Sequence, residues 1–131
     1  MGHPTIYPTG VTVYNPEKCW NGFTIFRALE VGAVLMNMNG RENKVWKGVH
    51  GFPNKIFPGG YLMTSRGSRD GRYGVQDGLD LVQIDWDGNV VWKFDRNEYI
   101  EDPGIPGRWM ARSHHDYQRE GSTTGYYAPG M

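Results

Sequence analysis

The chain has 131 residues, and its 19 Gly and 8 Pro make up about a fifth of them, against a usual share of about 12%. Leu and Ala number only five and four, which argues against a helical bundle, because helices are built from such residues and tolerate Gly and Pro poorly. Lys plus Arg and Asp plus Glu are 14 each, so the formal net charge is zero. A nucleic-acid partner is therefore not expected.

An all-β fold of short strands joined by tight turns fits this composition best. The longest apolar stretch covers only residues 31–36, whereas a membrane-spanning helix needs about 20 residues, so no membrane partner is expected. The N-terminus shows no signal peptide and the sequence as written indicates a cytoplasmic protein; a processed or replaced N-terminus would indicate the periplasm instead. Cys19 is the single cysteine, which excludes an intramolecular disulfide.

In chain order, residues 1–31 are predicted to form an N-terminal arm and the first strands, with strand candidates at 11–14 and 22–28. An internal repeat follows. VLMNMNG at 34–40 aligns with VQIDWDG at 82–88 at an offset of 48, and KVWK at 44–47 aligns with VVWK at 90–93 at an offset of 46. The smaller second offset predicts that the first turn is two residues longer than the second.

Each copy of the repeat has the pattern of a β-hairpin. Asn-Gly at 39–40 and Asp-Gly at 87–88 supply the positive φ that tight hairpin turns require. Residues 81–86 alternate between the two faces of a strand with a period of two. We expect Trp46 and Trp92, one in each second strand, to pack between neighbouring sheets.

A four-stranded unit of about 47 residues is typical of a β-propeller blade. The chain then divides into a half blade at 32–48, a full blade at 52–96, an inserted loop rich in Pro and Gly at 97–112, and the incomplete first half of the next blade at 113–131. These are about two antiparallel four-stranded blades, and a propeller has at least four. The remaining blades are expected from another polypeptide or from self-association.

Several segments resemble the N-terminal part of the bacterial arylsulfotransferase family: GFPNKIFPGGY at 51–61, LDLVQIDWDGNVVWKF at 79–94, HHDYQREG at 114–121, and the opening region 10–24. The resemblance implies a six-bladed propeller with a funnel at its axis. It implies sulfuryl transfer between phenols without a nucleotide sulfate donor, using histidines and an arginine near the axis. The histidine that carries the sulfuryl group is expected in later blades, outside this chain.

His114 and His115 are the predicted catalytic residues, at the start of the expected innermost strand. Adjacent strand residues face opposite sides of a sheet, so one imidazole is expected to face the channel and the other to pack between blades. Asp116 could orient a histidine through its ring N–H. An imidazole there could donate to a sulfate oxygen or act as a general acid or base. The alternative is a hydrogen-bonded pair with a structural role.

Further residues are candidates for substrate binding. Arg112 and Arg119 flank the histidine pair and suit a planar oxyanion. His50 precedes the inner strand of the predicted full blade, in the place equivalent to the pair. Trp109 could form an aromatic wall beside a substrate ring. Surface or anchoring roles are the alternatives for all four, and the charged loop 66–78 is expected to be solvated.

No metal is expected at the histidine pair, because a metal site needs three or four ligands. No cofactor is expected. Two functions stay open. The first is the N-terminal part of an arylsulfotransferase-like propeller enzyme that acts on small aromatic or organic sulfates. The second is a non-catalytic binding or assembly module that pairs its open strand edges with another chain or with itself.

Overall fold

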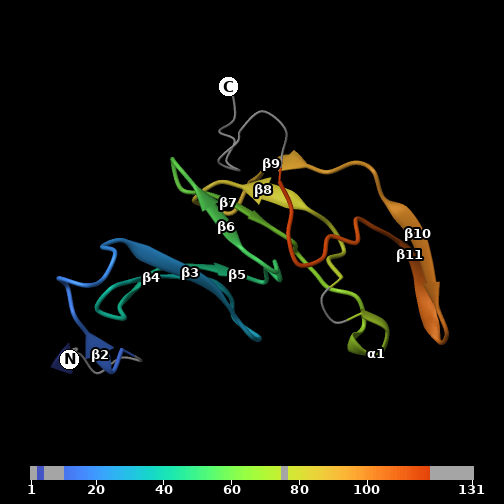
Figure 1. Ribbon diagram of the computed structural model, residues 1–131. Coiled ribbons are helices and arrows are strands. Elements are labelled where there is room, and N and C mark those ends of the chain that lie inside the picture. Colours follow the sequence, from blue (N-terminus) through green and yellow to red (C-terminus); the bar gives the residue numbers. More distant parts are fainter. Residues whose placement is uncertain (1–2, 5–10, 75–76, 119–131) are drawn as a thin grey trace.

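The computed structural model describes residues 3–4, 11–74 and 77–118. Over these residues the chain is all-β with antiparallel sheets, as its composition predicts (Figure 1). The helical content of the same residues is one short turn, α1 (Gly71–Gly74). No helix in the described part has the length and hydropathy to cross a membrane.

Two sheets and two smaller ribbons make up the fold (Figure 1). The first sheet has the order β3 (Phe23–Ala28), β4 (Gly32–Asn37), β5 (Glu42–Lys47). The second sheet has the order β6 (Lys55–Phe57), β7 (Tyr61–Thr64), β8 (Val82–Ile84), β9 (Val90–Lys93). The ribbons are β1 (His3–Pro4) with β2 (Val13–Tyr14), and β10 (Glu98–Asp102) with β11 (Ile105–Met110).

The turns of the two repeated hairpins are built in the same way. Gly40 and Gly88 have positive φ angles of 75° and 92°, as the sequence predicts. The Asn37 side chain accepts hydrogen bonds from two backbone N–H groups of its turn, at 3.0 Å each. The Asp85 carboxylate does the same in the second turn, at 2.9 and 2.8 Å. Short polar side chains that bond to nearby backbone stabilise such turns.

The register shows that the two turns have equal length, so the predicted two-residue difference is wrong. Leu35 pairs with Lys44, and Gln83 pairs with Trp92, which keeps the offset at 48 residues on both strands. A bulge also falls at the same place in each hairpin. Trp92 is therefore structurally equivalent to Lys44 and not to Trp46. Aligning the two tryptophans in the sequence gives an offset of 46 and hides the true offset of 48. The error is easy to make, because a shift of two residues keeps a side chain on the same face of a strand.

The two sheets pack against each other through an apolar cluster in which Trp46 is the largest side chain. Trp46 is 3% exposed and packs with residues of both sheets, among them Leu35 of the first and Leu62 of the second. Its indole N–H donates to the backbone oxygen of Asp85 at 3.2 Å. The prediction that Trp46 packs between sheets is confirmed.

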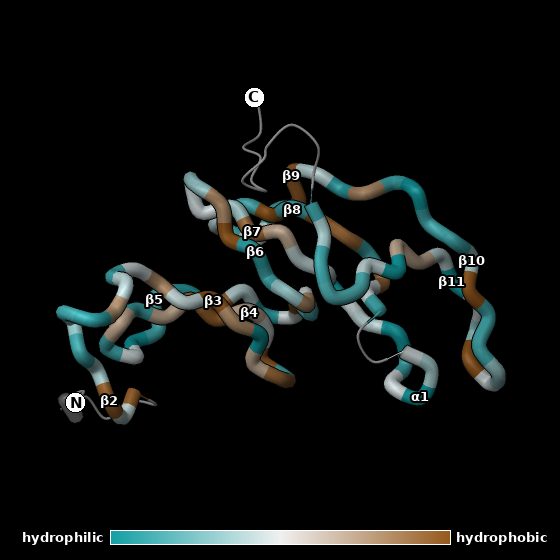
Figure 2. The backbone as a smooth tube through the Cα atoms, in the orientation of Figure 1, coloured by the Kyte–Doolittle hydropathy of each residue, from teal (hydrophilic) through white to brown (hydrophobic). Residues whose placement is uncertain are grey.

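A second apolar cluster covers the opposite face of the second sheet. Phe57, Met63 and Leu81 are buried there, and Trp92 is one of the partly buried residues that pack against them. The second sheet therefore has an apolar layer on both faces, and Figure 2 shows hydrophobic residues along its strands. Such two-sided burial is typical of a sheet that stands between two other layers.

Residues 97–112, predicted as an inserted loop, form a β-hairpin instead. β10 and β11 pair from Glu98↔Met110 to Asp102↔Ile105 and project away from the second sheet (Figure 1). Pro103 and Gly104 make the two-residue turn, where Gly104 has a φ of 77°. Pro followed by Gly is a turn signal that the high Pro and Gly content of the segment concealed.

Candidate functional site

The histidine pair does not lie on a strand. His114 takes part only in isolated bridges, and His115 sits at a bend with a φ of 62°. The two imidazole rings consequently lie together, with centroids 4.2 Å apart and planes inclined by 36°. The predicted opposite orientation is therefore wrong, because it depends on extended backbone. The His115 ring also packs edge-on against Phe52, with centroids 5.6 Å apart.

The backbone around the pair is strained. Arg112 and His115 have φ angles of 51° and 62°, in the left-handed region that costs side-chain-bearing residues free energy. Strain of this kind persists where surrounding contacts impose it, and it clusters at functional sites. At Arg112 these contacts are backbone hydrogen bonds from Gly78 N to Ser113 O at 2.8 Å and from Arg112 N to Gly78 O at 3.0 Å, and at His115 the contact is the bond from Asp116 N to His114 O at 2.7 Å.

An open groove of about 730 Å³ lies beside the pair. One wall is aromatic and comes from Trp92, Phe94 and Tyr117. Arg112 and His114 line the same groove, so apolar ring surface and nitrogen donors face one space. Arg96, Asp95 and Asp116 complete its charged rim. A groove with this lining can accept a flat aromatic molecule that carries a negative charge.

The chain matches no protein-family model, no curated protein and no solved structure.

Asp77 lies beside the histidine pair. Its side chain is 11% exposed, and its Oδ1 lies 3.8 Å from Nδ1 of His114. Its Oδ2 lies 3.1 Å from Nη1 of Arg69 and 3.8 Å from Nε of Arg112. Arg69 also holds Asp102 by two bonds, at 2.5 and 2.9 Å. Arg69 and Asp77 of the loop 66–78 thus belong to a buried ion network, contrary to the prediction of a solvated loop, whereas Arg66 and Arg72 of the same loop are exposed.

Asp116 serves another partner. Its Oδ1 lies 2.5 Å from Nζ of Lys55, which lowers the pKa of the Asp116 carboxyl. The same ammonium donates to the backbone oxygen of Tyr117 at 2.7 Å. The Tyr117 hydroxyl in turn bonds to the backbone oxygen of Met63 at 3.0 Å, and burial raises its pKa. These contacts hold the histidine segment, residues 112–117, against the second sheet.

The structure brings four of the predicted site residues together and separates two others. His114, His115, Arg112 and Asp116 are neighbours in the chain and share this region. Trp109 is 66% exposed and stacks edge-on against Tyr99 on the β10–β11 hairpin. His50 lines a separate small cavity near the turn that joins β3 and β4. Arg119 lies outside the described residues.

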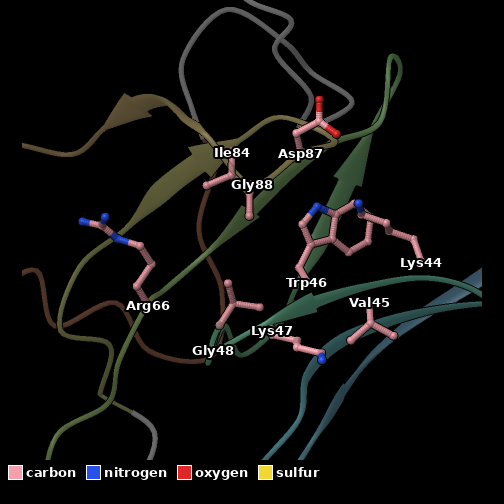
Figure 3. A pocket seen from close by; sticks show the side chains of 10 residues that line it. Lys44, Val45, Trp46, Lys47, Gly48, Arg66, Ile84, Asp87 and Gly88 are labelled. Carbon is pink, nitrogen blue, oxygen red and sulfur yellow. The ribbon is translucent and has the colours of Figure 1, made fainter.

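A second cavity, of about 420 Å³, lies between the two sheets around Trp46 (Figure 3). The Lys44 ammonium lies 5.3 Å from the centroid of the Trp86 ring. Arg66, on the other side, is paired with Asp80 at 2.8 Å, and Figure 3 shows its side chain extending away from that of Lys44. The cationic side chains of this cavity do not point toward one position where an anion could bind. The groove at His114 is therefore the better candidate site.

Sequence reasoning missed several residues of the site. Trp92 lies in β9 and Phe94 directly follows its end, where the Phe94 backbone N–H still donates to the Leu81 backbone oxygen at 2.9 Å. A spacing of two in extended backbone places both side chains on one face, but the repeat in the sequence predicts the interface between the sheets for Trp92 instead. Asp77 and Arg69 gave no local signal. Among the described residues, no group of three or more His, Cys, Asp or Glu could hold a metal ion.

The Arg69–Asp102 pair is expected to make the free energy of unfolding depend on pH in the acidic range. The hydrogen bonds from Arg69 lower the pKa of Asp102. Because the folded state favours the ionised carboxylate, the pair contributes its full stabilisation above the ordinary carboxyl pKa of about 3.9. This stabilisation is lost as the pH falls through the lower pKa of the folded state. We expect the wild type to lose stability in urea melts over that range. Arg69→Met should flatten the dependence and lower the urea midpoint.

The surface pair of Arg72 and Asp70 is the control for this titration. Arg72 lowers the pKa of Asp70 to about 2, but the Arg72 side chain is 67% exposed. At an ionic strength of about 1 M the screening length is about 3 Å. At this salt concentration, Arg72→Met should therefore no longer change the urea midpoint, whereas Arg69→Met should still lower it by most of the low-salt amount. An equal loss of both effects in salt would contradict the buried network.

Proposed function

We propose that this chain forms part of a β-propeller enzyme of the arylsulfotransferase type and that its groove binds an aromatic sulfate ester. The observation that carries the proposal is the lining of the groove. Trp92, Phe94 and Tyr117 line it with ring surface, and Arg112 and His114 line the same space with nitrogen donors for an oxyanion, although Nη1 of Arg112 also bonds to Glu98 at 3.2 Å. Aromatic rings stack on such walls, and guanidinium groups bind planar oxyanions with paired hydrogen bonds.

The architecture supports the same proposal. Two sheets stack face to face, and their hairpins repeat at 48 residues with the same turn and the same bulge. Such repetition is typical of propeller blades. In the proposed enzyme, a nitrogen of a carrier histidine from a segment outside this chain bonds to the sulfur of an aryl sulfate as the bond between sulfur and the aryl oxygen breaks. The aryl oxygen leaves as a phenolate and takes up a proton, and a second phenol then loses its proton and takes the sulfuryl group from the histidine. His114 and Arg112 would hold the sulfuryl oxygens.

A binding or assembly module without catalysis is the second candidate function. The first sheet has three strands and the second has four, and by the repeat the missing neighbour lies at β3. Phe23 and Phe26 of β3 are exposed, and an open edge strand of this kind pairs readily with another chain. Mass and size measurements on the purified material would reveal a partner polypeptide or self-association.

The aryl sulfate prediction is tested by titrating the protein with 4-nitrophenyl sulfate and following the fluorescence of Trp92, compared with a Trp92→Phe variant. We expect saturable binding, and weaker binding of both 4-nitrophenol and inorganic sulfate, because each lacks one half of the ligand. Arg112→Ala and His114→Ala should each weaken binding by about tenfold, the scale of one hydrogen bond to a charged group.

Arg72→Ala is the matched control, because Arg72 is an exposed arginine outside the groove; its affinity should equal that of the wild type. Equal affinities for all variants would contradict the assignment of the groove. For transfer, the assembled protein is assayed for sulfuryl transfer from 4-nitrophenyl sulfate to phenol. If a variant with both His114→Ala and His115→Ala keeps the wild-type rate, the pair takes no part in the reaction.

A further inference from the structure

Asp77 and His114 face each other across two segments that are far apart in the sequence. Oδ1 of Asp77 lies 3.8 Å from Nδ1 of His114, which is within ion-pair range and about 1 Å longer than a hydrogen bond. Distances of this kind shorten in many sites when a ligand binds. The imidazole therefore presents one nitrogen to a buried carboxylate, while its ring lines the groove.

The position of Asp77 is fixed from the opposite side. Nη1 of Arg69 holds its Oδ2 at 3.1 Å, and the backbone N–H of Arg69 donates to the Asp77 backbone oxygen at 2.8 Å. Arg69 is itself held by Asp102 through two hydrogen bonds. A carboxylate anchored in this way has little freedom to turn from the imidazole.

The backbone sets the spacing between the two side chains. Gly78, next to Asp77, exchanges two backbone hydrogen bonds with the segment that precedes His114. A Cβ at position 78 would overlap Oγ of Ser113 and would lie 3.1 Å from Oγ of Ser65. The same Cβ would lie 3.2 Å from the backbone oxygen of Asp80, and the two backbone hydrogen bonds hold the backbones of the two segments close together at this position.

We propose that Asp77 is a positioning residue for His114. The carboxylate holds the proton on Nδ1 and turns Nε2 toward the groove. If the groove binds an aryl sulfate, as proposed above, Nε2 accepts a proton from a phenol or, when protonated, donates to a sulfate oxygen. Asp77 thus takes the orienting role that the sequence suggested for Asp116, which pairs with Lys55 instead.

The nitrogen shifts of the His114 ring test this without any ligand. Two-bond ¹⁵N–¹H spectra of the labelled wild-type protein distinguish a neutral imidazole protonated on Nδ1 from one protonated on Nε2. We expect the Nδ1-protonated form in the wild type and a shift toward the other form in Asp77→Asn. Asp70→Asn, on the same loop, should leave the spectrum unchanged. Protonation on Nε2 in the wild type, or a tautomer that responds to Asp116→Asn and not to Asp77→Asn, would overturn the proposal.

A double-mutant cycle measures the consequence for binding. Asp77→Asn should weaken 4-nitrophenyl sulfate binding by about fivefold to tenfold, a common scale for coupling between neighbouring groups. In a His114→Ala background the same change should have no further effect. Equal losses in both backgrounds would show that Asp77 acts through the fold or through Arg112, whose Nε lies 3.8 Å from its Oδ2, and would overturn its positioning role for His114. Absence of binding by the wild type would refute the proposed function, while the nitrogen spectra would still decide the role of Asp77.

Discussion

Trp46→Ala is expected to lower the free energy of unfolding by about 3–5 kcal/mol, the usual cost of removing a buried tryptophan. Trp46 is 3% exposed and is the largest side chain of the apolar cluster between the two sheets. The change also removes its hydrogen bond to the Asp85 backbone oxygen and its edge-on contact with Trp86, at 5.3 Å between centroids.

Urea denaturation of three tryptophan variants measures this effect. Trp20 is 94% exposed, so Trp20→Ala should change stability by about 0.5 kcal/mol or less. Trp92→Ala should fall between the two, because Trp92 is only partly buried, and it should also weaken binding in the groove. Equal losses for Trp46→Ala and Trp92→Ala would contradict the 48-residue register and would favour the equivalence that the sequence suggests.

Gly32→Ala is expected to cost about 3 kcal/mol or more, from steric overlap and from backbone strain together. Gly32 begins β4 with a φ of 138°. An added Cβ would overlap the backbone oxygen of Trp46 and lie 3.1 Å from Cα of Lys47. These are backbone atoms of a paired strand, which can yield only if β4 and β5 separate.

Two further glycines separate the contributions of strain and overlap. Gly88 has a φ of 92° but nothing within 4 Å of an added Cβ, so Gly88→Ala should cost about 1–2 kcal/mol from strain alone. Gly22 has open space and no positive φ, so Gly22→Ala should be close to neutral. Thermal or urea unfolding of all three variants gives the ranking. A cost for Gly32→Ala no greater than that for Gly88→Ala would contradict the close strand contact.

The sequence predicted those parts of the fold that depend on neighbouring residues. The turns at 37–41 and 85–89 are made by side chains that bond to backbone within four residues, and by glycines whose φ is positive. The residues that specify each turn are therefore close together in the sequence and can be recognised from it. The same holds for the all-β class and for the residues that the histidine segment brings to the groove.

The tertiary structure decided the relations between segments that are distant in the chain. Asp77 lies 37 positions before His114, and Arg69 lies 33 before Asp102, so neither pair leaves a local pattern. The equivalence of Trp46 and Trp92 failed for a related reason: register depends on pairing across strands, and side chains two positions apart share a face. The rings of the histidine pair lie together because His115 is the middle of a tight turn, closed by a hydrogen bond from the Asp116 backbone N–H to the His114 backbone oxygen at 2.7 Å, and not part of an extended strand. Composition and turn chemistry thus determined a β-sheet protein with repeated hairpins, while packing between distant segments determined which side chains share the groove.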